Sequence, residues 1–141
     1  MNDEQHGYQD LILQHAKTPV GQGELPAGCR SSTIENQLCG DVVTIHLAWN
    51  EAGQAQLGFV SSGCSLCRAS ASILIAAVTG LSDLDVTARV EEFRTCFPTV
   101  QTSPEILSMP AVRALYDLRR YPSRQRCVLL PWDALNKLLY T

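Results

Sequence analysis

The segment Val42–Phe59 reads VVTIHLAWNEAGQAQLGF and carries the clearest structural pattern in this chain. Apolar residues occupy every second position from Val43 to Trp49, and the same alternation resumes after a short polar segment. This period is typical of strands that bury one face, and Asn50–Gly53 between the two runs is a turn signal. The segment therefore predicts a β-hairpin.

Segments with a helical pattern lie on both sides of the hairpin. Their apolar residues recur at three- and four-residue steps or fill the segment almost completely. We expect helices at Glu4–Lys17, at Arg68–Val78, from Ser82 onward, and at Ala111–Arg119. Ser82 and Asp85 form a capping pattern for the third of these, and Gly80 is expected to end the second. A weaker strand signal at Thr33–Gln37 precedes the hairpin.

The last expected helix contains a proline. Val128, Trp132 and Leu135 share one of its faces, and Pro131 lies among them. Because proline is tolerated in the first turn of a helix but not further along, we expect this helix to begin near Cys127–Leu130.

This order of elements predicts an α+β fold. A small antiparallel three-stranded sheet is expected to pack against several helices, in a single domain that spans residues 1–141.

Composition and charge exclude several classes of function. The 141 residues carry 11 Lys and Arg against 14 Asp and Glu, a net charge of −3, which does not favour nucleic-acid binding. The longest aliphatic run, Ile73–Val78, is too short to cross a membrane, and the polar start Met1–Gln5 is unlike a secretion signal. We therefore expect a cytoplasmic protein that binds neither nucleic acid nor a membrane.

Six cysteines are many for such a chain. In a reducing compartment they are more often metal ligands or reactive thiols than disulfides, although some are expected to pack as small buried hydrophobes. If the hairpin turn is centred on Asn50–Gly53, the numbers of facing residues add up to about 103, so Cys39 faces Cys64. Asp41 lies two residues from Cys39 and points to the same side of the sheet.

Cys64 precedes one expected helix, and Cys127 stands at the expected start of the last one. A helix N-terminus favours a thiolate, and three thiolates with one carboxylate would complete a tetrahedral zinc site. Thiolates also suit an iron–sulfur cluster. The residues alone leave open whether these cysteines do metal or thiol chemistry or only pack in a core. The pair Cys64-x-x-Cys67 also allows a redox site, although no βαβ pattern precedes it.

Several other residues are assigned no chemical role. Cys29 and Cys96 are treated as non-ligands, and His46 is expected to be a packed or surface histidine. Cys67 is undecided, because it lies one turn from Cys64 and can line the site or pack.

Three motifs in order resemble a known family. They are Cys39-Gly40-Asp41, Gly63-Cys64-Ser65 followed by Ala69-Ser70-Ala71-Ser72, and Arg124-Gln125-Arg126-Cys127. The chain is similar to the U-type iron–sulfur cluster assembly proteins, and specifically to their SufU-type branch. The IscU-type scaffolds carry a histidine directly before the last cysteine, where this chain has Arg126, and residues 103–123 resemble the insertion of the SufU branch.

The resemblance implies an activity and a set of residues. Cys39, Asp41, Cys64 and Cys127 resemble the zinc ligands, Cys39 resembles the sulfur acceptor, and Arg124 is expected to support the site. The implied partner is a cysteine desulfurase of the SufS type, which would displace Cys39 from zinc and hand over persulfide sulfur, with downstream iron–sulfur assembly proteins as receivers. The alternatives are a scaffold that assembles an iron–sulfur cluster on the same cysteines, and a structural zinc domain that only binds a partner.

Overall fold

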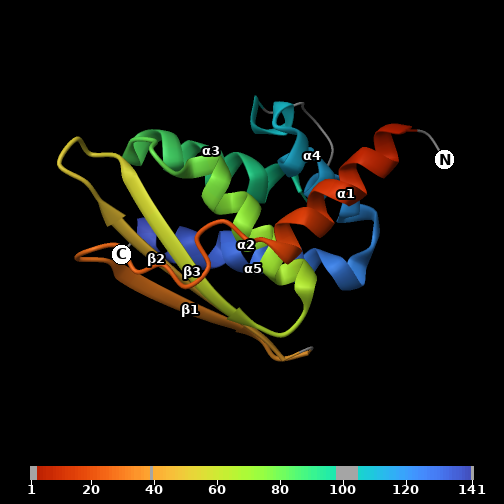
Figure 1. The fold of residues 1–141 in the computed structure, drawn as a ribbon, viewed down its shortest axis with the longest axis horizontal. Coiled ribbons are helices and arrows are strands. Elements are labelled where there is room, and N and C mark those ends of the chain that lie inside the picture. The colour runs from red at the N-terminus through yellow and green to blue at the C-terminus, as the bar shows by residue number, and fades with distance from the viewer. Residues whose placement is uncertain (1–2, 39, 98–104, 141) are drawn as a thin grey trace.

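The computed structural model describes residues 3–38, 40–97 and 105–140, and it holds a three-stranded sheet backed by helices (Figure 1). The elements in chain order, with η for short 3-10 helices, are α1 (Asp3–Lys17), β1 (Arg30–Asn36), β2 (Asp41–Trp49), β3 (Ala55–Ser62), α2 (Ser65–Val78), α3 (Asp83–Cys96), η1 (Glu105–Ser108), α4 (Pro110–Tyr116), η2 (Asp117–Arg120) and α5 (Pro122–Leu139). The predicted α+β class is confirmed. Among the helices of the described segments, none combines the length and apolar character that a membrane span requires.

The strands form one antiparallel sheet in the order β1-β2-β3. The hairpin is confirmed, and so is the weaker first strand, but the predicted register of the hairpin is wrong by one residue. Trp49 pairs with Ala55 and Val42 pairs with Ser62, so the numbers of facing residues add up to 104. The described pairing ends at Val42 and Ser62, so it does not reach Cys64.

The turn between β2 and β3 explains this shift. It spans residues 50–54, one more than the expected turn. The side-chain oxygen of Asn50 accepts hydrogen bonds from the backbone N–H groups of Ala52 and Gln54, both at 2.9 Å, and this favours the longer loop. Cys39 lies outside the described residues, so its contact with Cys64 stays a prediction.

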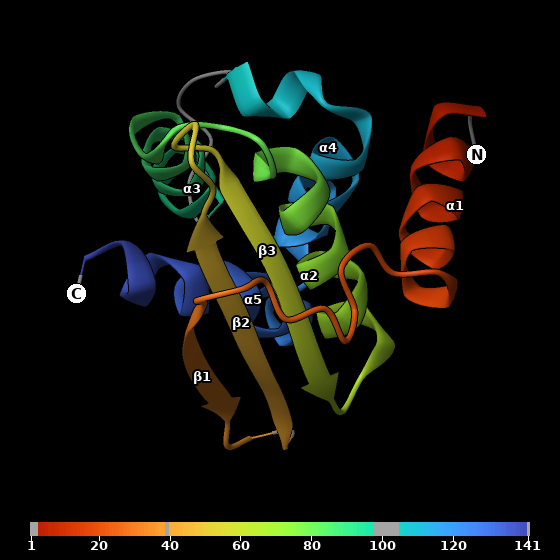
Figure 2. The same cartoon turned by 60° about the vertical axis from the view of Figure 1, so that its left-hand side comes forward.

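Helices cover one face of the sheet. Val43, Ile45 and Phe59 point into the core and are 0% exposed. Figure 2 shows α2 and α5 behind the strands, with α1 beside α2, and α2 contacts β3 while α5 contacts β1 and β2. The core therefore lies between the sheet and the helices α2 and α5. These two helices belong to different parts of the chain, and they bring residues of both parts to the same end of the sheet.

The loop after α1 crosses the other face of the sheet (Figure 2). A side chain at Gly58 would overlap the carbonyl oxygen of Glu24 in this loop, so only glycine fits there. His46, on the same face, is 8% exposed, and its Nδ1 is 2.6 Å from the hydroxyl of Ser31. His46 was expected to be a packed or surface histidine, and it is packed.

The helix ends mostly follow the local signals. Ser82 caps α3 by accepting the backbone N–H of Asp85, and Gly80 adopts φ +87° after the end of α2. The single helix expected at Ala111–Arg119 is two elements, α4 and then η2, because the chain tightens into a 3-10 turn at Asp117.

The predicted start of the last helix is wrong. Helix α5 begins at Pro122, which takes the first-turn position that proline favours, and Pro131 lies inside the helix. An internal proline costs about 3 kcal/mol and removes one helical hydrogen bond, here to the carbonyl of Cys127. The burial of Trp132 and Leu135, both 0% exposed, offsets this cost. Cys127 therefore lies in the second turn of α5 and not at its N-terminus.

Candidate metal centre

Asp41 is the first residue of β2 and is 1% exposed. Its Oδ1 accepts a hydrogen bond from the backbone N–H of Cys64 at 2.7 Å. Gly63 permits this close approach, because it adopts φ +120° and because a Cβ there would overlap Asp41 Oδ1 and lie 2.8 Å from Asp41 Cα. The backbone next to Cys64 thus fixes the orientation of a buried carboxylate.

Cys64 is the N-cap of α2, which begins at Ser65 and not at the predicted Arg68. Its backbone is extended, with φ −78° and ψ 154°, and its Sγ accepts the backbone N–H of Cys67 at 3.4 Å. The residue is exposed. Its sulfur therefore lies at the positive end of the α2 dipole, beside a backbone N–H.

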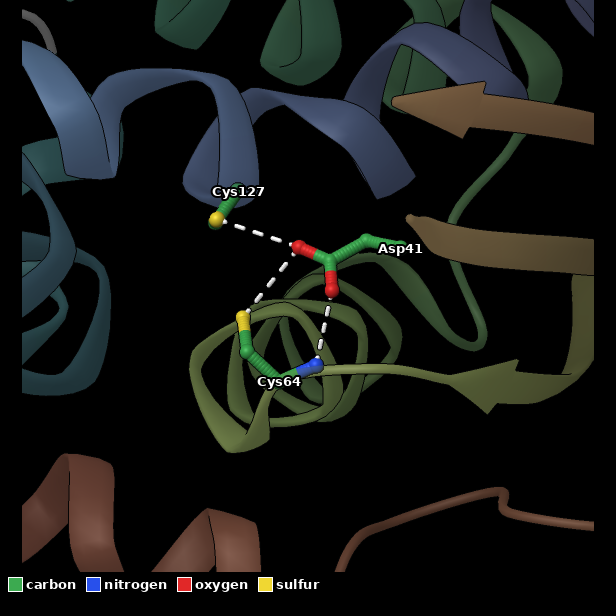
Figure 3. A group of neighbouring side chains, drawn as sticks. All are labelled: Asp41, Cys64 and Cys127. Atoms are coloured by element: carbon green, nitrogen blue, oxygen red, sulfur yellow. Dashed lines mark hydrogen bonds between the residues drawn. The ribbon is translucent and has the colours of Figure 1, made fainter. Parts of the chain in front are cut away.

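Cys127 faces the same carboxylate from the other side (Figure 3). Its Sγ donates to Asp41 Oδ2 at 3.2 Å, and the Sγ of Cys64 donates to that same oxygen at 3.3 Å. Cys127 is 8% exposed, and burial, followed by its hydrogen bond to Asp41, raises the pKa of its thiol well above the ordinary value. Without a cation, this thiol keeps its proton.

The geometry of these three residues suits a metal ion. One ligand atom each from Asp41, Cys64 and Cys127 lies within 4.8 Å of the other two. Two sulfurs and a carboxylate oxygen are donors that zinc accepts, and thiolates disfavour magnesium and calcium. Both thiol protons point at one carboxylate oxygen, so a cation that replaced them would meet three ligands at once.

Among the described residues, the ligand group contains none of the other predicted residues, and Cys39 lies outside those residues. Arg124 is exposed in the first turn of α5, with its guanidinium carbon 5.2 Å from the centre of the Tyr121 ring, and its supporting role stays a prediction. Cys67 is 0% exposed and packs in the core, although its backbone N–H reaches Cys64. Cys29 and Cys96 do not belong to the metal-ligand group found among the described residues.

Gly63 is the residue whose role sequence reasoning missed. The motif that resembles the family includes it, but only as a neighbour of Cys64. Its signal was available, because a glycine directly before a helix cap often marks a positive φ or a close backbone approach.

A groove of about 520 Å³ lies between the end of β1 and α5. It is lined by Glu35, Asn36, Gln37, Leu38, Arg126, Leu129, Leu130 and Asp133. Arg126 adjoins Cys127 in sequence, and Asn36 pairs with Asp41 across the β1–β2 ladder. The groove therefore lies next to the candidate centre, and its charges are mixed.

The sequence matches known proteins over most of its length. The family model of the NifU-like N terminal domain matches residues 7–134. An iron–sulfur cluster assembly scaffold protein, IscU, of Streptococcus pyogenes serotype M1 is 27% identical over 95% of this chain and 83% of its own length. A zinc-dependent sulfurtransferase, SufU, of Bacillus subtilis strain 168 is 25% identical over 92% of this chain and 87% of its own.

A solved structure shares the fold. It is that of a candidate iron–sulfur cluster assembly scaffold protein for the SUF system of Fervidobacterium islandicum AW-1. The TM-score is 0.75 at 24% identity, with 94% of this chain and 96% of that one covered. The sheet, the helices and their order are therefore common to the two proteins.

Proposed function

The chain belongs to the family of NifU-like N-terminal domains, and on this premise we propose that it is a zinc-containing sulfur acceptor in iron–sulfur cluster assembly. In this proposal Cys39, Asp41, Cys64 and Cys127 hold the zinc, and Cys39 takes persulfide sulfur from a cysteine desulfurase of the SufS type. Downstream assembly proteins receive the sulfur. The cytoplasm is the compartment that we expect, because reducing conditions keep thiols available.

The meeting of Asp41, Cys64 and Cys127 carries this proposal. These residues come from β2, the start of α2 and α5, and their ligand atoms lie within 4.8 Å of one another. A chance cluster of core cysteines would not aim two thiols at one oriented, buried carboxylate. Cys39 is included because it is two residues from Asp41 in the matching motif.

When bound, zinc would keep a coordinating thiol deprotonated at neutral pH. The chain itself contributes Asp41, which its own backbone orients, and Cys64, whose sulfur lies at the positive end of α2. In the transfer, the Cys39 thiolate attacks the outer sulfur of the partner's persulfide. One sulfur–sulfur bond forms as another breaks, the desulfurase cysteine leaves as thiolate, and no net oxidation occurs.

A scaffold for an iron–sulfur cluster is the second candidate, because the IscU relative from Streptococcus pyogenes is named as such a scaffold. Two features favour zinc. The carboxylate of Asp41 belongs to the ligand group, and zinc accepts such a mixed set. Arg126 stands directly before Cys127, where the IscU-type scaffolds have histidine.

Metal analysis of freshly purified protein separates the two candidates. We expect about one zinc per chain and no visible absorption, as for a mononuclear thiolate site. Asp41→Ala should lose most of this zinc, whereas Cys29→Ser, a change outside the ligand group, should keep it. Iron with acid-labile sulfide in the wild type would favour the scaffold instead.

Sulfur transfer tests the acceptor. The protein is incubated with a cysteine desulfurase and labelled cysteine, and persulfide on each peptide is measured by mass spectrometry. Cys39→Ser should abolish labelling and stimulation of the desulfurase, whereas Cys29→Ser should leave both intact. Full sulfur acceptance by Cys39→Ser would reject the assignment.

A further inference from the structure

Two buried serines two residues apart on α2 hold different helices. Ser70 and Ser72 are both 0% exposed, and each hydroxyl has two hydrogen-bonding partners. Residues two apart on a helix point to nearly opposite sides. Ser70 contacts α5, and Ser72 contacts the end of α1 and the residues after it.

Ser70 makes two hydrogen bonds to α5 next to Pro131. Its hydroxyl donates to the backbone carbonyl of Val128 at 2.6 Å and accepts the indole N–H of Trp132 at 3.1 Å. These two residues lie on either side of Pro131, and Val128 directly follows Cys127. All of these groups are buried.

Helix α5 is weakened where it presents Cys127. Pro131 has no N–H, so the carbonyl of Cys127 lacks its usual partner within the helix. Such a position can bend or shift unless another element restrains it. The hydroxyl of Ser70 supplies a restraint at the next carbonyl, and it comes from α2, the helix that Cys64 caps.

We propose that Ser70 is a positioning residue for the metal centre, which holds Cys127 at the distance and angle that Asp41 and Cys64 require. For its effect on metal binding, this inference rests on the proposed function. The loss of the hydroxyl leaves the indole N–H of Trp132 without this acceptor in a dry environment and removes the bond from α2 to the Val128 carbonyl, so the α2–α5 contact should rearrange beside Cys127.

Ser72 provides a matched control. Its hydroxyl is equally buried, lies 2.7 Å from Nδ1 of His15 and accepts the backbone N–H of Val20 at 2.7 Å. Ser72→Ala thus removes the same atom from the same helix and also breaks two hydrogen bonds. Its partners belong to α1 and the following loop, and none of them is a ligand.

The first experiment measures zinc affinity by chelator competition in the full chain. Ser70→Ala should bind zinc about 10- to 100-fold more weakly, the range for residues that orient ligands, and cobalt(II) bound in place of zinc should show altered absorption bands. Ser72→Ala should stay within about twofold of the wild type. Equal affinities for the two variants would overturn the proposal.

Trp132→Phe is a second variant for the case in which Ser70→Ala does not fold. It removes the N–H that Ser70 accepts, together with part of the buried ring, and leaves the hydroxyl bound to Val128. We expect a loss of zinc affinity smaller than that of Ser70→Ala and larger than that of Ser72→Ala. An affinity no lower than that of Ser72→Ala would contradict the positioning role.

A metal-free measurement separates this inference from the proposed function. A short bifunctional thiol reagent is added to the apoprotein, and the rate at which it bridges Cys64 and Cys127 is followed by peptide mass spectrometry. Bridging depends on the geometry of the two sulfurs, so it can be measured even if the wild type binds no zinc. Ser70→Ala should bridge several-fold more slowly than Ser72→Ala and the wild type, and equal rates would reject the role of Ser70.

Discussion

The two halves of the candidate centre are built in different ways. Asp41 and Cys64 lie 23 residues apart at the two ends of one hairpin, and a backbone N–H joins them at 2.7 Å. Cys127 comes from 86 residues beyond Asp41, and the contact between them is a thiol–carboxylate hydrogen bond of 3.2 Å. We call the first pair the hairpin half and Cys127 with its part of α5 the α5 half.

This difference shows what determines the position of the ligand atoms in each half. The β2–β3 ladder and the positive φ of Gly63 determine the hairpin half, so it forms whenever the hairpin does. The α5 half depends on side-chain packing across the core, at a point where Pro131 has removed a helical hydrogen bond. Changes in the core should therefore disturb Cys127 while Asp41 and Cys64 stay together.

The largest expected effect comes from Trp132, which anchors the α5 half. Its side chain is 0% exposed and stacks on Phe93 with ring centres 4.0 Å apart. Trp132→Ala should lower the free energy of unfolding by about 3–5 kcal/mol, because it opens a large cavity and removes a partner of Ser70. Urea unfolding of the apoprotein, followed by circular dichroism, measures this loss.

Trp49 is the control for this change. It lies at the end of β2 and is 40% exposed. Trp49→Ala should cost much less, because the solvent already reaches the ring and only a small cavity can form. Similar losses for the two tryptophan variants would mean that packing at Trp132 does not determine the α5 half.

Gly63→Ala tests the hairpin half at a smaller cost in stability. The strained φ of +120° should reduce the free energy of unfolding by about 1–3 kcal/mol. The added methyl group also collides with the backbone and carboxylate of Asp41, so zinc binding should weaken more than stability does. Chelator competition and urea unfolding on the same samples give the two quantities.

Gly53→Ala separates the effect of backbone strain from the effect of a collision with Asp41. Gly53 lies in the hairpin turn with φ +74°, and a Cβ there would meet nothing within 4 Å. This variant should lose a comparable free energy of unfolding but keep its zinc affinity. If Gly63→Ala also keeps its zinc affinity, Asp41 does not need the close approach that Gly63 allows.

Sequence patterns predict the hairpin half better than the α5 half. The alternation after Val42 identified both strands, and Cys64 was expected just before the helix, although α2 begins at Ser65 and not at Arg68. The register was off by one because Asn50 folds the turn into a five-residue loop, a choice made by side-chain hydrogen bonds that a spacing argument does not include.

The α5 half could not be placed by local rules. Those rules placed the start of the last helix just before Pro131. The helix in fact begins at Pro122 and continues past Pro131, because the burial of Trp132 in the core offsets the cost of the internal proline. No spacing in the sequence indicates that Ser70 would hold Val128. The approach of Cys127 to Asp41 followed from the family resemblance and from tertiary packing, not from the periodicity of its own helix.

The smallest expected effect concerns α1, which packs against α2 but provides no ligand among the described residues. The hydroxyl of Ser72 accepts the N–H of Val20 and lies 2.7 Å from Nδ1 of His15, so it joins α1 to α2. Burial lowers the pKa of His15 below its ordinary value of 6.5. In the unfolded chain the imidazole takes up a proton near that value, while in the folded chain it stays neutral to lower pH.

This contribution to stability is therefore complete above about pH 6.5 and is lost as the pH falls toward the lower folded-state pKa. Urea unfolding of the apoprotein between pH 7.5 and pH 5 should show a shallower pH dependence for His15→Gln than for the wild type. Hydrogen exchange in acid should accelerate first in α1, while β2 and the start of α2 stay protected, because no bond of either half involves His15. Identical slopes for the two proteins would show that His15 is not coupled to folding, and early exchange in β2 would show that the hairpin half depends on α1 after all.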